Sequence, residues 1–325
     1  MLISLGAASA SDINNTVDDQ VLSATPTVDT LSFSVNNGDQ DNNTLSVSEN
    51  NLLSAGSDSG SNELLGTDDS KSSFTNLFDL IRMSHDPIIT LYDDYEFKND
   101  QSDQQYINGI TLSVNGLTID GGNHTIDGKN MSNLFSTIDG DNITIKNLNL
   151  KDINGRLTWN GNNGVFDHIT SINSNTFYVY GDNMNITHST FKDKTMPNAG
   201  PIVSIVGLNT YVFDNTFENI QVICPDTVAG GSLVFVQNSA KNTRIINNTF
   251  DKCYVKATSS YMGLIVLYGL TYFEGNHVKN CSSTQSVVYF GMPNTQLKHN
   301  DFININSGRF FSAETNLVTF DHCNL

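Results

Sequence analysis

Histidines recur at one position of a repeated pattern, three residues before a large apolar residue. They are His168, His188, His299 and His322, and Asn147, Asp214 and Asn247 complete the same column. His168, His188 and Asp214 fall on consecutive repeats, so their side chains would converge as metal ligands do if the repeats stack on one another. The alternative is a polar column at a turn that happens to contain imidazoles. Both interpretations stay open from the sequence.

Two of the four cysteines also share a position. Cys253 and Cys281 stand three residues after the large apolar residue, where other repeats have Ile153, Ile220 and Ile305. A disulfide between neighbouring repeats is conceivable. The alternative is a pair of small buried side chains in an apolar column. No Cys-x-x-Cys spacing is present to indicate zinc.

Carboxylates stack on adjacent repeats at one place only, at Glu218 and Asp251, in a column that Lys192 and Lys279 continue. Enzymes that cleave polysaccharides need clustered Asp or Glu with Arg or Lys as acid, base or calcium ligands. After residue 106 the sequence has no Asp-Asp pair, no Gly-His-Gly and no Arg-x-Lys. We therefore expect no catalytic residues and no cofactor.

Aromatic residues in the short apolar runs are the candidates for binding. Alternation along a strand points part of each run outward, so Trp159, Tyr180, Tyr268 and Tyr289 could form a strip on which sugars stack. Packing in the core is the alternative for each of them.

The elements that must position these residues follow from one repeated phrase. It is clearest in GDNITIKNLNL (140–150), GDNMNITHSTF (181–191) and GLNTYVFDNTF (207–217). Its last residue is an apolar anchor, and successive anchors are 20 to 33 residues apart: Leu150, Ser171, Phe191, Phe217, Phe250, Val278, Phe302 and Leu325. A period of this size indicates a solenoid.

Equivalent positions of the repeats carry the same residue types, which indicates that they stack directly at about 4.8 Å. We expect Asn215, Asn248, Asn276 and Asn300 to form a ladder of amide hydrogen bonds. Asn and Gly both tolerate the left-handed backbone that a sharp corner requires. Short β-branched and aromatic runs lie between the phrases, without hairpin turn signals or helical spacers. The sequence therefore predicts an all-β fold, a right-handed parallel β-helix.

The N-terminal third differs in composition. Residues 1–10 end in Ala-Ser-Ala and resemble the remnant of a signal peptide. Residues 11–72 are rich in Ser, Asn and Asp, and we expect them to be disordered. In the next segment, 73–105, Phe74, Leu77, Phe78 and Ile81 share one face of a short helix that would cap the first coil. The β-helix would occupy 106–325 and, because it stops on an anchor without a capping element, we expect it to be truncated or covered at that end.

The net charge of the chain limits the kinds of partner that it can bind. The net charge of −18, with only 16 Lys and Arg, argues against nucleic acid binding. The sequence contains no run of 18 or more apolar residues, so it predicts no transmembrane segment. The signal-like start predicts an exported, extracellular protein.

The stretch YINGITLSVNGLTIDGGNHTIDGKNMSNLFSTIDGDNITIKNLNLKD (106–152) resembles the adhesin-like surface proteins of methanogenic archaea, whose β-helices belong to the pectate-lyase-like superfamily. The resemblance implies a secreted, non-catalytic protein that binds glycans or neighbouring cell surfaces. It brings no catalytic residues. The alternatives are a pectate-lyase-like polysaccharide lyase or glycoside hydrolase, and a structural spacer without a ligand.

Overall fold

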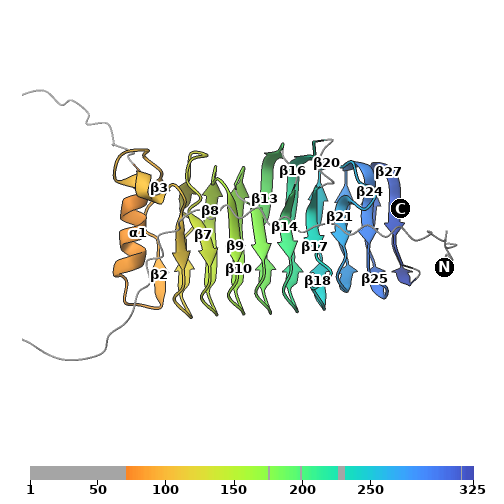
Figure 1. Cartoon of the computed structure of the whole chain (residues 1–325), viewed down its shortest axis with the longest axis horizontal. Coiled ribbons are helices and arrows are strands. Elements are labelled where there is room, and N and C mark those ends of the chain that lie inside the picture. The colour runs from red at the N-terminus through yellow and green to blue at the C-terminus, as the bar shows by residue number, and fades with distance from the viewer. Residues whose placement is uncertain (1–70, 175, 198–199, 226–230, 316) are drawn as a thin grey trace, which may run out of the picture. The chain divides into compact units, whose positions relative to one another are not determined.

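A computed structural model describes residues 71–325, apart from 175, 198–199, 226–230 and 316. The expected signal-peptide remnant and nearly all of the expected disordered lead lie outside the described residues. Within them, 28 strands form one sheet in which every pairing is parallel. Each strand pairs with its equivalent in the next coil, and the strands stack side by side from the N-terminal helix to the last coil (Figure 1). The predicted all-β parallel β-helix is therefore confirmed.

Each coil contributes strands to three faces. The first face contains β2 (Ile88–Thr90), β5 (Thr118–Asp120), β12 (Asn185–Thr187), β15 (Tyr211–Phe213), β18 (Thr243–Ile246), β22 (Thr271–Glu274), β25 (Thr295–Lys298) and β28 (Val318–Asp321). The second contains β1 (Ser72–Ser73), β3 (Tyr95–Glu96), β6 (Thr125–Asp127), β13 (Thr190–Met196), β16 (Thr216–Ile223), β19 (Thr249–Asp251), β20 (Tyr254–Lys256), β23 (His277–Lys279) and β26 (Asp301–Ile303). Strands β8 (Thr144–Lys151) and β10 (Val165–Ile172) run through the corner between these two faces. The third contains β4 (Ile110–Leu112), β7 (Phe135–Ile138), β9 (Arg156–Trp159), β11 (Thr176–Val179), β14 (Gly200–Ile205), β17 (Gly231–Val236), β21 (Gly263–Leu267), β24 (Ser282–Phe290) and β27 (Asn306–Ala313). The first residues of β24 and β27 continue the second face, where β24 pairs with β20.

Corners between the faces are made by residues with left-handed backbone. The column before the first face has Asn142, Asn163, Asn183, Asn209 and Asn242, with φ between 55° and 59°. Asn tolerates this region better than most residues because its short side chain hydrogen-bonds locally. The side-chain nitrogen of each of these Asn residues after the first donates to the side-chain oxygen of the one before it, at 3.0–3.2 Å.

The glycine of the repeated phrase has a different role from the one expected. Gly161, Gly181 and Gly207 do not have positive φ. A Cβ on any of them would collide with the carbonyl oxygen of the equivalent glycine in the preceding coil. Glycine is therefore required for close approach of the coils, while the Asn two residues later makes the turn.

Anchor residues fill the interior. The rings of Phe191, Phe217 and Phe250 stack on one another, with centroids 5.0 and 4.8 Å apart and interplanar angles of 14° and 10°. All three are at most 2% exposed. Stacked identical anchors bury a continuous apolar column, which is the main favourable contribution to folding.

A second Asn column lies inside the coils, two residues before the anchors. Asn215, Asn248, Asn276 and Asn300 are at most 1% exposed. The side-chain nitrogen of each of the first three donates to the side-chain oxygen of the next, at 3.0, 3.0 and 3.1 Å. The same nitrogens also donate to backbone carbonyls of the preceding coil, for example Asn276 to Ile245 at 2.9 Å. These buried polar groups are thus fully paired, as burial demands.

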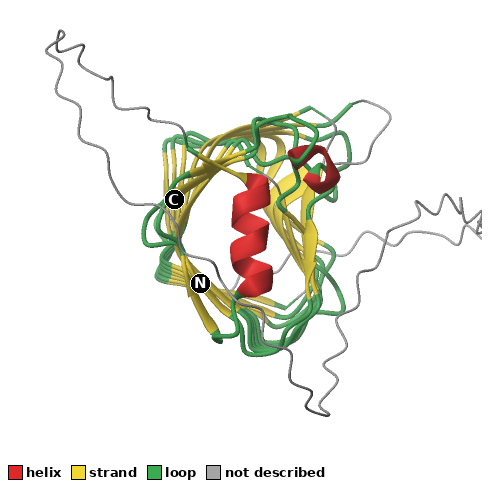
Figure 2. Ribbon diagram, turned by 90° about the vertical axis from the view of Figure 1, so that its left-hand side faces the viewer, coloured by secondary structure: helices red, strands yellow, loops and turns green. Residues whose placement is uncertain are grey.

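The expected helix is present at the N-terminal end as α1 (Phe74–Met83). It lies across the opening of the first coil (Figure 2) and buries Phe74, Leu77 and Phe78 against the core. The Ser73 hydroxyl caps it by accepting from the Asn76 backbone N–H at 3.2 Å. Asp103 lies in the 3₁₀ helix η1 (Asp103–Tyr106) and accepts from the Thr75 backbone N–H at 2.8 Å. Its carboxylate stabilises α1 because negative charge interacts favourably with the positive N-terminal end of a helix dipole.

Strand pairing begins earlier than residue 106, where the β-helix was expected to start. β2 pairs with β5, and β3 pairs with β6, so the first coil includes residues of the expected 73–105 cap. Ser72, assigned to the disordered lead, pairs with Tyr95. No described helix is long and apolar enough to cross a membrane.

Candidate functional site

The first face places an arginine between two tyrosines on adjacent strands. Tyr211 in β15 pairs with Arg244 in β18, which pairs with Tyr272 in β22. Each stands next to a buried residue of its strand, for example Ile245 beside Arg244, so alternation points the three side chains outward. Two strand spacings separate the tyrosines, which is roughly 10 Å.

These side chains line an open groove of about 550 Å³. Asn209, Thr210 and Asn242 of the corner before the first face complete its wall. The Arg244 guanidinium lies over the Tyr272 ring, with its Cζ 5.7 Å from the ring centroid. Among the described residues, no carboxylate lies within ion-pair distance of Arg244. The groove thus offers aromatic surface, amides fixed by their own hydrogen bond (Asn242 to Asn209, 3.1 Å) and an available cation.

A cluster of imidazoles lies at the corner where the first face ends, toward the N-terminal end of the β-helix. His168 and His188 stack with their ring centroids 4.8 Å apart and an interplanar angle of 27°. Their Nδ1 atoms lie 2.8 and 2.7 Å from the two carboxylate oxygens of Asp167. Phe213 contacts His188 edge-on at 5.6 Å and stacks on Tyr211 at 5.3 Å. The Phe213 ring therefore joins the cluster to the groove.

Hydrogen bonding decides the charge of Asp167. Partial burial acts to raise the pKa of this carboxyl, but hydrogen bonds from Thr187, His188 and His168 outweigh it and lower the pKa to about 2. The Thr187 hydroxyl donates at 2.6 Å. Asp167 is consequently an anion held by three donors.

The expected trio of His168, His188 and Asp214 needs correction. The two histidines converge, but the carboxylate between them belongs to Asp167, and Asp214 lies outside the group whose ligand atoms are within 4.8 Å of one another. All three expected residues make the corner between the first and second faces, with φ of 53°, 47° and 54°. Their shared column therefore reflects a left-handed turn, which Asn, Asp and His populate more readily than other residues.

The predicted aromatic strip does not exist as one surface. Trp159 is 2% exposed and Tyr289 is 1% exposed, so both predictions of an exposed ring were wrong. Trp159 stands two residues after Leu157 on β9, so both side chains point into the core. The Tyr289 ring is covered by the rings of Tyr261 and Tyr268, whose centroids are 5.9 and 5.3 Å away. Tyr180 is exposed and Tyr268 is half-buried.

Sequence reasoning missed Tyr211, Arg244 and Tyr272. A signal for them was present, because all three stand six residues before their anchors Phe217, Phe250 and Val278. That position alternates with the apolar one five residues before the anchor, so it must point outward.

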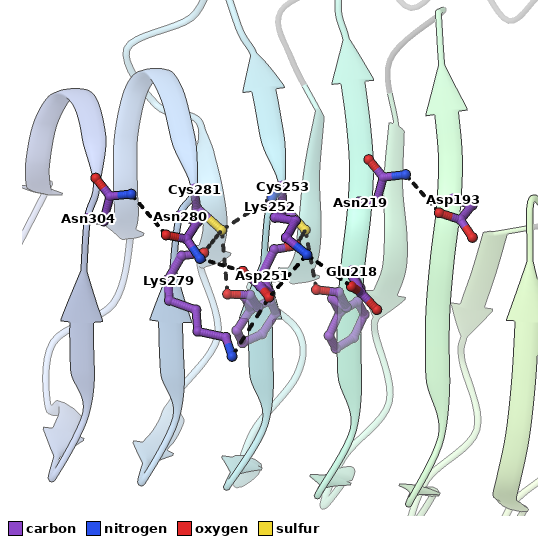
Figure 3. Close-up of polar contacts among 12 residues, drawn as sticks. Asp193, Glu218, Asn219, Asp251, Lys252, Cys253, Lys279, Asn280, Cys281 and Asn304 are labelled. Carbon is purple, nitrogen blue, oxygen red and sulfur yellow. Dashed lines mark hydrogen bonds and ion pairs between the residues drawn. The ribbon is translucent and has the colours of Figure 1, made fainter.

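The cysteine and charge columns make structural contacts on the second face (Figure 3). Cys253 and Cys281 are free, buried thiols, and the Cys253 backbone N–H donates to the Cys281 Sγ at 3.4 Å. The Lys252 Nζ lies 3.4 Å from Glu218 and 4.0 Å from Asp251, and Lys279 pairs with Asp251 at 3.7 Å. Cations between the stacked carboxylates of Glu218 and Asp251 neutralise them, and such surface pairs contribute little to stability.

Fold and groove together define the chain as a parallel β-helix protein with an aromatic, arginine-containing groove on one face. No protein-family model and no curated protein sequence matches it. Among solved structures, the chain is similar to endopolygalacturonase I from Stereum purpureum, with 14% identity and a TM-score of 0.36 over 72% of this chain and 84% of that one. It is also similar to PfbA, a surface adhesin of Streptococcus pneumoniae, with 14% identity and a TM-score of 0.35 over 73% and 80% of the two chains. For an endo-xylogalacturonan hydrolase from Aspergillus tubingensis the values are 15%, 0.30, 72% and 80%. Likenesses this distant assign no activity.

Proposed function

We propose that this chain is a non-catalytic, adhesin-like protein of the cell surface that binds glycans along the first face of its β-helix. The observation that carries the proposal is the register of Tyr211, Arg244 and Tyr272 along an open groove. Aromatic rings present flat apolar surface to the C–H face of a sugar, and amides and guanidinium groups hydrogen-bond its hydroxyls. A binding site of this kind combines aromatic surface with a few fixed polar groups.

The sequence supports the surface location. Residues 106–152 resemble adhesin-like surface proteins of methanogenic archaea, and the signal-like first ten residues fit export. A net charge of −18 keeps such a protein soluble and repels copies of itself. We therefore place this protein outside the cell, with glycans or neighbouring cell surfaces as its partners.

The ionisation of the carboxyls supports a role without catalysis. A glycosidase acid needs a raised pKa so that it still holds its proton near neutral pH. Among the described residues, each Asp or Glu whose pKa departs clearly from its ordinary value has a lowered pKa: Asp93, Glu96, Asp100, Asp120, Asp127 and Asp167. These groups are suited to holding cations and donors, not to delivering protons.

A glycan array on the full chain, combined with an assay for released reducing sugar, tests the proposal. Tyr272→Ala and Arg244→Gln should each weaken binding at least about tenfold, which corresponds to roughly 1.4 kcal/mol. The matched control is Arg156→Gln, because Arg156 lies over Tyr178 on the third face, 4.6 Å from its ring centroid and outside the groove. The control should bind like the wild type.

The other outcomes separate the alternatives. Release of reducing sugar by the wild type would show an enzyme and overturn the non-catalytic role. Binding that survives both groove substitutions would place the glycan elsewhere on the molecule. Absence of binding to any glycan on the array would favour a structural spacer.

A further inference from the structure

The cluster of Asp167, His168 and His188 has a feature that the proposed function does not use. Both imidazoles direct Nδ1 at the same carboxylate, one to each oxygen, at 2.8 and 2.7 Å. Their rings are stacked within 27° of parallel and extend from equivalent positions of adjacent coils. With Nδ1 of both rings facing Asp167, both Nε2 atoms lie on the opposite, common side.

The carboxylate also fixes the tautomer. An ionised carboxylate only accepts hydrogen bonds, so each Nδ1 must carry the proton that it donates. In a neutral imidazole the lone pair is then on Nε2. Among the described residues, neither Nε2 has a hydrogen-bond partner, and the two side chains are 58% and 39% exposed. When both imidazoles are neutral, the cluster presents two nitrogen lone pairs to solvent, side by side.

We propose that His168 and His188 bind one divalent transition-metal ion of the zinc class through their Nε2 atoms, with Asp167 as the positioning residue and water in the remaining coordination positions. Imidazole nitrogen suits zinc, copper and nickel, while magnesium and calcium prefer oxygen. A carboxylate that accepts from the other ring nitrogen is the usual support of a metal-binding histidine.

The dimensions permit this site. Zinc–nitrogen distances of about 2.1 Å and tetrahedral angles require the two Nε2 atoms to lie about 3.4 Å apart. The stacked rings have centroids 4.8 Å apart, and both are exposed at a corner, so small side-chain rotations bring the nitrogens together. No other described group of three His, Cys, Asp or Glu residues has its ligand atoms this close.

A second stacked pair gives an internal comparison. His299 and His322 lie in the same column, with centroids 5.4 Å apart and an interplanar angle of 18°. Their Nδ1 atoms face two different carboxylates, Glu274 at 3.6 Å and Asp321. Without a shared anchor the two rings are oriented independently, so the ion should prefer the first pair.

The test measures zinc binding to the full chain after bound metal has been removed. Calorimetry gives the affinity and the analysis of metal content gives the stoichiometry, with magnesium as the control ion. We expect the double variant His168→Asn, His188→Asn to bind one equivalent less zinc than the wild type. Asn occupies the same column at Asn147 and Asn247 with φ of 53° and 56°, so these variants keep the corner. Asp167→Asn should weaken the affinity by 10- to 100-fold while leaving the stoichiometry intact.

His277→Asn is the matched control, because the His277 Nδ1 faces Asp301 at 2.9 Å but, in the described part of the chain, its ring stacks on no second histidine. It should bind zinc like the wild type. Unchanged zinc stoichiometry and affinity in the double variant, or no zinc bound by the wild type, would overturn the site. Circular dichroism and thermal melts confirm that the variants are folded. No glycan is present in this experiment, so its result is independent of the proposed adhesin function.

Discussion

The side-chain oxygen of Asn276 accepts two hydrogen bonds from Asn248, one from its side-chain nitrogen at 3.0 Å and one from its backbone N–H at 2.9 Å. Both residues are completely buried. The same pair of hydrogen bonds links Asn276 to Asn300, from the side-chain nitrogen at 3.1 Å and from the backbone N–H at 2.9 Å. A buried polar network of this kind is favourable only while every member keeps its partners.

Replacing Asn248 with Ala should therefore destabilise the protein strongly. The change removes the acceptor of the Asn215 side chain and backbone N–H and leaves buried groups unpaired, each of which costs about 1–3 kcal/mol. We expect a loss of about 3–5 kcal/mol in the free energy of unfolding, measured with guanidinium. Asn163→Gly, on the exposed corner ladder, should cost less than about 1 kcal/mol, since glycine accepts the left-handed backbone. Equal losses in the two variants would contradict the ladder's role.

Gly181→Ala should disrupt the packing of the coils. The added Cβ would collide with the Gly161 carbonyl oxygen, which belongs to backbone and cannot move aside. We expect a loss of roughly 3 kcal/mol or more, at the upper end of overpacking effects. Gly116→Ala is the comparison, since nothing lies within 4 Å of its added Cβ and only its φ of 74° opposes the change. That strain amounts to about 1–2 kcal/mol, so the two thermal melts should differ clearly.

Acid should weaken the fold through Asp127. Burial acts to raise the pKa of this carboxyl, but hydrogen bonds from Lys151 and the Lys129 backbone, with the charges of both lysines, lower it below the ordinary 3.8. The folded state thus binds the proton less readily than the unfolded chain. The contribution of Asp127 to stability is complete above about pH 4 and is lost as the pH falls further. Melting temperatures between pH 7 and pH 2.5 should fall more steeply for the wild type than for Asp127→Asn, and parallel curves would refute this assignment.

Thiol reagents should distinguish one cysteine from the other three. Cys224, Cys253 and Cys281 are at most 2% exposed, whereas Cys323 is partly exposed. Burial also raises the pKa of Cys253, which removes its reactive thiolate at neutral pH. We expect one rapid equivalent in the native protein and four in denaturant. Rapid labelling of Cys253, located by peptide mapping, would contradict the packing of this column.

Periodicity made the scaffold predictable. The spacing of the anchors indicated coils of at least 20 residues, and like residues in like positions implied direct stacking, as the Phe217 and Phe250 rings show. The face shared by Phe74, Leu77 and Phe78 predicted α1 because amphipathicity at helical period requires no knowledge of the rest of the fold. These features depend on backbone register, which the sequence encodes directly.

Side-chain direction was harder to infer. Asp167 stands one position before the histidine column, and only the turn at the corner brings its carboxylate to both imidazoles. The burial of the Tyr289 ring depends on its contact with Tyr261, which lies in another coil. A comparison of equivalent positions in the repeats shows which residues stack on one another, but it does not show contacts between residues at different positions of the repeat.

Coil joins coil through hydrogen bonds that repeat almost unchanged, with the Asn side-chain oxygens accepting from backbone N–H groups at 2.9 Å from Asn215 through Asn300. Such a junction does not depend on which two coils meet. Duplication of one whole coil, for example the segment between the anchors Phe250 and Val278, would present the same donors and acceptors on both sides. The length of this protein is therefore adjustable in whole turns, by recombination in nature or by gene assembly in the laboratory, without redesign of its interior.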